Sequence, residues 1–312
     1  MVSAVFHNPL EARDAARAES RDSTVKPSAA QDANTSHPSP TMTSTTAPAP
    51  ATPRAPIDWG GWALAILAPV AGLALLIGIW ALLTAKSNTF PTPVATWDAA
   101  VALFADPFYD NGPNDQGIGW NILFSLERVA MGFGLAAVVG IPMGFIIGRS
   151  KIINSMLNPI ISLLRPVSPL AWLPIGLLVF KSADPAAIWT IFICSIWPMI
   201  INTAVGVQRV PDDYLNVAKV LNLSEWKIVT KILFPSVLPY MLTGVRLSIG
   251  TAWLVIVAAE MLTGGVGIGF WVWDEWNNLN VQHIIIAIVV IGVVGLLLEQ
   301  ALVAIAKRFS YE

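Results

Sequence analysis

Long apolar stretches alternate with short polar ones along most of this chain. Each long stretch holds enough residues to cross a bilayer core, which takes about 20 in a helix. We therefore predict an all-α, polytopic membrane protein with six membrane-spanning helices, at residues 60–84, 120–148, 152–180, 186–207, 237–260 and 284–306.

The third stretch differs from the others because four prolines interrupt it and Arg165 lies inside it. Proline disturbs helical hydrogen bonding, so a bent or broken segment is expected. Irregular backbone at membrane depth persists only where protein or a water-filled cavity covers it. Packing of a bent helix and lining of a transport route are both open interpretations of this stretch.

The second stretch carries a small residue at every fourth position. Residues four apart lie on one face of a helix, and small side chains there let another helix backbone come close. We therefore expect a helix-packing seam along Gly132, Ala136, Gly140, Gly144 and Gly148.

The composition supports a membrane protein: 55% of the residues are hydrophobic and 12% are charged, against about 25% charged in soluble domains. The formal net charge of −2 gives no reason to expect a nucleic-acid partner. Cys194 is the one cysteine, so no disulfide or cysteine metal site is expected within a single chain. Membrane lipid is the expected partner of the apolar surface.

The N-terminal residues 1–57 are polar and rich in Ala, Pro, Ser and Thr, a composition typical of disorder. We expect a disordered cytoplasmic tail, unless part of it reflects a start codon placed too far upstream. Residues 58–117 are expected to hold the first membrane helix and a periplasmic loop, followed by the main domain at 118–308.

Basic residues mark one side of the six-helix arrangement. The positive-inside rule places that side in the cytoplasm, together with both termini. The loops at 85–117 and 261–282 are acidic and fall on the other side. The orientation rests on Arg149, Lys151, Arg209, Lys219, Lys227, Lys231, Lys307 and Arg308.

The stretch 211–235 is the longest amphipathic segment between membrane helices, and it is expected to form two short helices. Ser224 is placed to cap the second helix, and Pro235 to end it before the next membrane segment. Its apolar contact surface is expected to come from Leu215, Ala218, Leu221, Val229, Ile232 and Leu233. From the spacing alone, a loop lying on lipid headgroups is an equally good interpretation.

Ionisable residues inside membrane stretches are costly unless they are paired or hydrated, so they mark candidate functional positions. Arginines there can present positive potential to an anion. The alternative is that each arginine pairs with a glutamate of another helix and fixes the packing. Glu299 is expected to be a snorkelling or packing residue and not a relay. The candidates for a translocation path are Arg128, Arg165, Arg246 and Glu260.

The sequence shows no grouping that carries catalytic chemistry. It contains no Gly-x-x-x-x-Gly-Lys-Ser/Thr loop for nucleotide phosphates, and no Ser/His/Asp or metal-ligand cluster at helical spacing. The chain is therefore expected to be no enzyme and to hold no cofactor or metal. If ATP drives the protein, another chain must bind that ATP.

The segment 211–235 resembles the EAA loop of permease subunits in ABC importers. In that family the loop docks in a groove of the ATP-binding subunit and passes on its movement. This chain departs from the family pattern with Asn216 in place of the acid and Asn222 in place of the glycine. The resemblance implies a docking face on which Ala218 lies, and a coupling set of Asn216, Val217, Ala218, Asn222, Ile232 and Pro235.

Two further stretches, 164–174 and 253–277, are similar to permeases of the nitrate, bicarbonate, sulfonate and taurine branch. The resemblance covers 118–308 and implies a type I ABC importer permease in the cell inner membrane. The implied assembly is a homodimer of permease chains, two cytoplasmic ABC ATP-binding subunits that bind ATP and Mg, and an external substrate-binding protein. The stretch 253–277 looks like the nitrate-type branch, so nitrate is the expected substrate.

Other assignments stay open at this point. Within the same class, bicarbonate, nitrite and an organosulfonate such as taurine are alternative substrates. In a different class, a secondary anion transporter or channel needs no motor, and the docking-like loop argues against it. A membrane-embedded enzyme is disfavoured by the missing catalytic groups.

Overall fold

The computed structural model describes residues 59–86, 90–113 and 115–309, and the tail predicted at 1–57 lies outside them. Within these ranges the chain is helical apart from a short antiparallel hairpin of β1 (Asp110–Gly112) and β2 (Asp115–Gln116). The long helices are α2 (Trp59–Thr84), α4 (Ile118–Arg149), α7 (Ala183–Gln208), α10 (Phe234–Thr263) and α12 (Val281–Phe309). The shorter elements are α3 (Pro93–Leu103), α5 (Lys151–Leu164), α6 (Pro169–Phe180), α8 (Asp212–Val220), α9 (Glu225–Ile228), the π-helical η1 (Val229–Leu233) and α11 (Ile268–Asn277).

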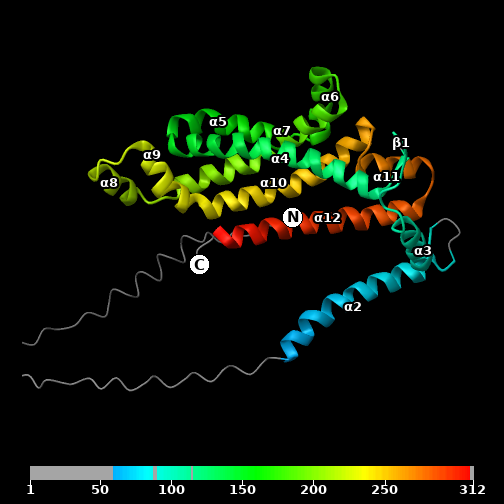
Figure 1. Cartoon of the computed structure of the whole chain (residues 1–312). Helices are drawn as coiled ribbons and strands as arrows, with labels where there is room; N and C mark the ends of the chain where they lie inside the picture. Colours follow the sequence, from blue (N-terminus) through cyan, green and yellow to red (C-terminus); the bar gives the residue numbers. More distant parts are fainter. Residues whose placement is uncertain (1–58, 87–89, 114, 310–312) are drawn as a thin grey trace, which may run out of the picture. The chain divides into compact units, whose positions relative to one another are not determined.

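Five helical stretches among the described residues are long and apolar enough to cross a membrane, and α5 with α6 makes a sixth if the bent pair is one span. This agrees with the six predicted stretches, the third of which is broken as expected. The two halves of that pair meet at 99°, and α6 turns away from α5 in Figure 1. Pro169 keeps Ser168 out of helical backbone, and Ser168 Oγ then caps α6 by accepting a hydrogen bond from the Leu170 amide at 3.3 Å.

Helix α7 lies at the centre of the bundle and packs against both α4 and α10 (Figure 1). Of its most apolar stretch, 61% is buried, against 11% in α12. The predicted small-residue seam of α4 faces α7. A Cβ added at Gly132 would lie 2.7 Å from Ile191 Cβ, and one at Gly144 would lie 2.5 Å from Thr203 Cβ. The seam is therefore confirmed, because any side chain at these two positions would collide with α7.

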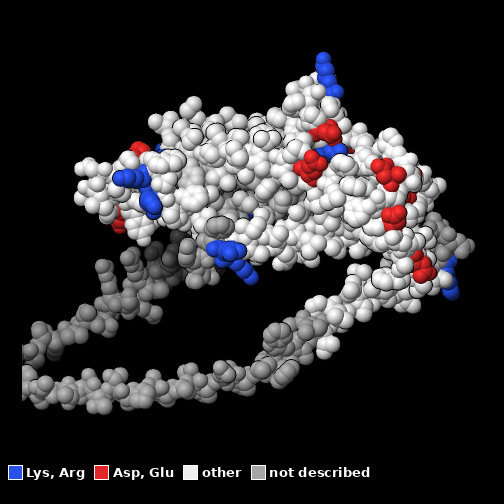
Figure 2. All heavy atoms as spheres, viewed as in Figure 1, with Lys and Arg blue, Asp and Glu red and all other residues white. Residues whose placement is uncertain are grey.

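Charged side chains are sparse on the bundle, as expected of a surface that faces lipid. Figure 2 shows the acidic side chains mostly over the end that carries α11 and α3. Basic side chains appear near the α8 and α9 end and at the C-terminal end of α12, with others on α6 and beside α3. The two ends of the bundle therefore differ in charge, as the sequence pattern predicts.

Both stretches predicted as polar loops contain short elements. The 85–117 stretch holds α3 and the hairpin, and the 261–282 stretch holds α11. Thr92 caps α3 through its Oγ1, which accepts a hydrogen bond from the Ala95 amide at 3.3 Å, and Pro93 follows at the first helical position. A Thr-Pro pair of this kind is a helix-start signal, so the sequence contained the information for α3.

Pro235 does not end the second short helix of the 211–235 segment, so that prediction is wrong. Helix α9 runs through η1 directly into α10, and Pro235 lies in the first turn of α10. The wider π turn shifts the hydrogen-bond register there, so the missing proline N–H interrupts nothing. Ser224 stands at the N-cap of α9 without making a capping hydrogen bond. One continuous helical stretch therefore links the segment to the membrane.

Candidate functional site

The inner face of α8 is anchored by Ala218. This side chain is 0% exposed and belongs to an apolar cluster with Ile228, Leu233 and Val237. The expectation that Ala218 lies on a docking face is therefore corrected, because it contacts the α9–η1–α10 stretch of its own chain. Leu233 of the predicted contact surface is also buried in this cluster. The spacing was ambiguous because α8 carries apolar residues on both of its faces.

Helices α8 and α9 also present exposed apolar side chains. Val220 is 82% exposed and Trp226 is 75% exposed. Large apolar side chains grouped on a charged segment are typical of a protein or membrane contact. This outward face consists of Tyr214, Val217, Val220, Leu221 and Trp226. Val217 is the member of the predicted coupling set that the structure places on it.

Asn222 ends α8 with a left-handed backbone, φ +48°. The Asn222 amide donates to Lys219 O and the Leu223 amide donates to Ala218 O, both at 3.0 Å, which is the Schellman pattern of helix ends. Glycine and asparagine are the residues that adopt this backbone at least cost. The asparagine at the family's glycine position therefore keeps the same turn.

The segment is held to the membrane helices mainly by its apolar cluster. Arg149 at the end of α4 also donates to Glu225 at the start of α9, at 2.6 Å. Both side chains are partly exposed, and exposed ion pairs contribute at most about 1 kcal/mol. The segment is therefore joined to α10 through packing and the continuous helix.

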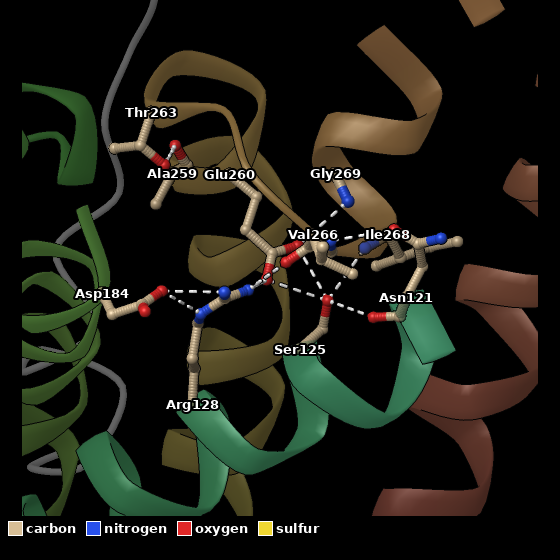
Figure 3. A network of polar contacts seen from close by, with 11 residues as sticks. Asn121, Ser125, Arg128, Asp184, Ala259, Glu260, Thr263, Val266, Ile268 and Gly269 are labelled. Carbon is tan, nitrogen blue, oxygen red and sulfur yellow. Dashed lines mark hydrogen bonds and ion pairs between the residues drawn. The ribbon is translucent and has the colours of Figure 1, made fainter. Parts of the chain in front are cut away.

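At the other end of the bundle, Glu260 of α10 is buried in a polar network (Figure 3). Its side chain accepts hydrogen bonds from Arg128 Nη1 at 2.7 Å, Ser125 Oγ at 2.8 Å and the Gly269 amide at 3.0 Å. The residue is 1% exposed. A buried carboxylate is tolerated only with such compensation, so the network fixes α10 against α4.

The same network caps the start of α11 with side chains from other helices. Asn121 Oδ1 accepts from the Gly267 amide and Ser125 Oγ from the Ile268 amide, each at 2.9 Å. The first amides of a helix have no partner within it. Because α4 supplies these partners, α11 is fixed across the end of the bundle. One polar stripe on α4 carries Asn121, Ser125 and Arg128, which are four and three residues apart. The sequence analysis did not identify this stripe.

Arg128 extends the network to α7 and to the loop before α11. It forms an ion pair with Asp184 at 2.8 Å and donates to Val266 O at 2.6 Å. Arg128 and Glu260 were both predicted as path candidates, and the structure brings them together. This geometry matches the packing alternative, an interhelical Arg–Glu pair.

Arg246 also has a carboxylate partner. Its Nε donates to Glu299 Oε1 at 2.9 Å, which joins α10 to α12. Glu299 was expected to be a snorkelling or packing residue, and this pair places it in helix packing. Arg246 and Glu299 lie apart from the Arg128 network, so the four predicted path residues do not form one site.

Arg165 differs from the other candidates. It lies at the bend between α5 and α6, and within the described ranges its guanidinium has neither an ion pair nor a hydrogen bond. Two adjoining hollows of about 460 Å³ and 290 Å³ share Arg165 and Ile201. Sequence reasoning missed their other polar residues, Asn158, Ser162, Asn202 and Thr251.

Together these features define a polytopic helical membrane protein with an amphipathic segment between two of its long helices. Residues 140–311 match the family of binding-protein-dependent transport system inner membrane components. The match covers more than half of the chain, so the chain belongs to this family. It is a multi-pass inner-membrane permease component.

The chain is similar to several transport permeases. It is 49% identical over 236 residues to the nitrate import permease protein NrtB of Synechocystis sp., covering 75% of this chain and 86% of that one. It is 50% identical to NrtB of Leptolyngbya laminosa, covering 75% and 84%. It is 44% identical to the bicarbonate transport system permease protein CmpB of Synechococcus elongatus, covering 75% and 86%.

A solved structure shares the fold. One chain of the MetNI methionine ABC transporter, in an inward-facing conformation, aligns with a TM-score of 0.52 at 15% identity, covering 62% of this chain and 98% of that one. At this identity the likeness concerns the fold alone. The fold is that of a type I ABC importer permease, as predicted.

Proposed function

We propose that this chain is the permease subunit of an ATP-driven nitrate importer. The observation that carries the proposal is the identity of 49–50% to two relatives named for nitrate import, over at least 84% of their lengths. The geometry supports it with an exposed coupling face at one end and an unpaired arginine at the broken span.

Bicarbonate is the second candidate substrate. Relatives named for bicarbonate transport are 44–45% identical to this chain, and one nitrate permease is also 44% identical. The sequence identities to nitrate and to bicarbonate permeases therefore overlap at 44–45%. The preference for nitrate rests on the two nitrate permeases at 49% and 50% identity. Nitrite and organosulfonates remain alternatives from the sequence, and no contact in the structure favours them.

The proposed assembly contains two copies of this chain, two cytoplasmic ATP-binding subunits and an external substrate-binding protein. ATP and Mg are bound by the ATP-binding subunits, because this sequence carries no phosphate-binding loop. The α8–α9 segment lies in the cytoplasm with both termini, since basic residues gather on that side. The outward face docks on the ATP-binding subunit.

Coupling then follows from how the segment is built. A displacement of the outward face moves α8, whose Ala218 belongs to the same buried cluster as Ile228 and Leu233. Those residues lie on the stretch that continues without a break into α10. The motion therefore reaches α10, which lines the Arg165 hollow through Leu247 and Thr251.

Among the predicted path residues, we assign the path role to Arg165. Arg128, Glu260 and Arg246 act as packing residues, because each is already engaged in an ion pair between helices. Arg165 has no such partner within the described ranges and faces open hollows. An unpaired arginine at membrane depth is stable only where water or an anion meets it.

The assignment is tested by uptake in cells that lack this chain, with nitrate, bicarbonate and taurine measured side by side. Selective loss of nitrate uptake, restored by the wild-type chain, is the expected result. Loss of bicarbonate or taurine uptake with intact nitrate uptake would move the protein to a sister branch. Unchanged uptake of all three in a strain without a redundant system would contradict the transport assignment.

A further inference from the structure

Arg165 follows the last residue of α5, at the end of that helix away from Lys151, and its side chain is exposed. The 14 residues of α5 rise about 21 Å from the basic end at Lys151, and a bilayer core is about 30 Å thick. Arg165 follows at the end of this rise, so a span that begins at Lys151 would carry it to membrane depth. Burying or half-burying an arginine there costs several kcal/mol unless water or a counter-charge meets it.

The residues around Arg165 offer donors and no negative charge. Asn158, Ser162 and Arg165 are four and three residues apart, so they share one face of α5, and all three line the larger hollow. None of their side chains has a hydrogen-bond partner within the described ranges. No aspartate or glutamate lines either hollow. The local field is therefore positive.

The smaller hollow continues this surface toward α7 and α10. It is lined by the apolar Trp197, Ile201 and Leu247 beside Arg165. Apolar walls displace water, which strengthens the attraction between a guanidinium and an anion. The guanidinium presents two parallel N–H groups, a geometry that fits two oxygens of a flat oxyanion.

We propose that Asn158, Ser162 and Arg165 form an anion-binding site within the permease itself, for a small planar oxyanion in transit. The site rests on the proposed function for the direction of transport, and it adds a binding step that is separate from the external binding protein. Arg165 supplies the positive charge and two parallel N–H groups, while Ser162 and Asn158 donate hydrogen bonds to the remaining oxygen. A site of few contacts both accepts and releases its ion, as conduction requires.

The experiment uses the complete importer reconstituted in vesicles, with nitrate-loaded binding protein in excess. The quantity measured is nitrate accumulated per ATP hydrolysed. Arg165→Gln is expected to lower this ratio about tenfold, because it removes a charge-assisted hydrogen-bond pair, while ATP hydrolysis stays stimulated by the loaded binding protein. Arg165→Lys keeps the positive charge but lacks the two parallel N–H groups. Its ratio of nitrate to ATP is expected to lie between that of Arg165→Gln and that of the wild type.

Lys181→Gln is the matched control. Lys181 lies at the C-terminal end of α6 on the same broken span, is exposed, and lines neither hollow. The Lys181→Gln substitution removes one positive charge and is expected to leave the ratio of nitrate to ATP unchanged. Ser162→Ala removes a donor and no charge, and it is expected to lower the ratio about threefold. If Arg165→Gln does not assemble, Ser162→Ala tests the proposed anion site in its place.

An unchanged ratio in Arg165→Gln or in Ser162→Ala would overturn the site. So would a parallel loss of uptake and ATP hydrolysis in Arg165→Gln that Arg165→Lys fully restores, because that pattern indicates an ion pair with a second chain. If the wild-type importer moves bicarbonate and not nitrate, the ratio is measured for bicarbonate. A tenfold loss there would support the site while the proposed substrate fails.

Discussion

Arg128 on α4 and Glu260 on α10 form a buried ion pair at 2.7 Å, although 132 residues separate them in the chain. Glu260 also accepts hydrogen bonds from Ser125 and from the first turn of α11. Helix α11 is thus attached to both long helices through polar contacts at its first turn. This carboxylate therefore joins α4, α10 and α11 at one end of the bundle.

Removing Arg128 leaves the Glu260 carboxylate buried without its counter-charge. Arg128→Met is expected to cost about 3–5 kcal/mol of stability and to lower the thermal unfolding temperature of the purified protein. Adding Glu260→Gln is expected to recover part of the loss, since a neutral amide is less costly to bury than an unpaired carboxylate.

The control for this prediction is Glu127→Ala. Glu127 is the exposed neighbour of Arg128 and has no ion pair within the described ranges. Its removal is expected to change stability by less than about 0.5 kcal/mol. Equal unfolding temperatures for Arg128→Met and Glu127→Ala would show that the buried pair is not needed.

The seam between α4 and α7 predicts different effects on stability when two glycines of α4 are each replaced by alanine. A Cβ at Gly144 would lie 2.5 Å from Thr203 Cβ and 2.9 Å from Ile200 O, whereas one at Gly134 would meet nothing within 4 Å. Gly144→Ala is expected to destabilise the protein by about 1–3 kcal/mol through overpacking. Gly134→Ala is expected to be neutral or stabilising by up to about 1 kcal/mol. Thermal unfolding in detergent measures both, and a common sign would refute close packing at the seam.

The outward face of the coupling segment predicts two distinct defects. Val217→Asp places a charge on an exposed apolar position and is expected to abolish uptake while leaving the amount of protein in the membrane unchanged. Ala218→Asp buries a charge in the cluster below and is expected to reduce that amount instead. Uptake and membrane abundance are measured for both variants. Normal uptake in Val217→Asp would argue against docking through this face.

Asn222 predicts a preference set by backbone geometry. Its φ of +48° suits glycine and asparagine, and a β-branched residue there is strained by about 1–2 kcal/mol. Asn222→Gly is therefore expected to keep both the fold and ATP-coupled uptake, and Asn222→Val to lower the unfolding temperature. Indistinguishable unfolding curves for Gly and Val would show that the turn is not constrained.

Local patterns allowed much of this fold to be predicted from the sequence. Apolar length alone placed the spans, and the four-residue glycine spacing identified the seam, because both depend only on helix geometry. The prolines in the stretch 152–180 predicted a break in that membrane helix. Its angle of 99° depends on packing against α7, which the local sequence does not encode.

The candidate site was harder to predict because its contacts are long-range. Arg128 and Glu260 each stood out as ionisable residues in apolar stretches, but nothing local says that they meet. Ala218 was assigned to the wrong face, since an alanine fits a docking surface and a buried cluster equally well. Arg165 was distinguished only once the structure gave carboxylate partners to the other arginines.

The most direct test of this account is ATP-dependent nitrate accumulation in vesicles that contain this chain, its ATP-binding subunits and a loaded binding protein. The account predicts accumulation of nitrate above the external concentration, only with ATP and only with this chain present. Nitrate movement without ATP would indicate a channel or secondary transporter. Accumulation of bicarbonate without nitrate would contradict the proposed substrate.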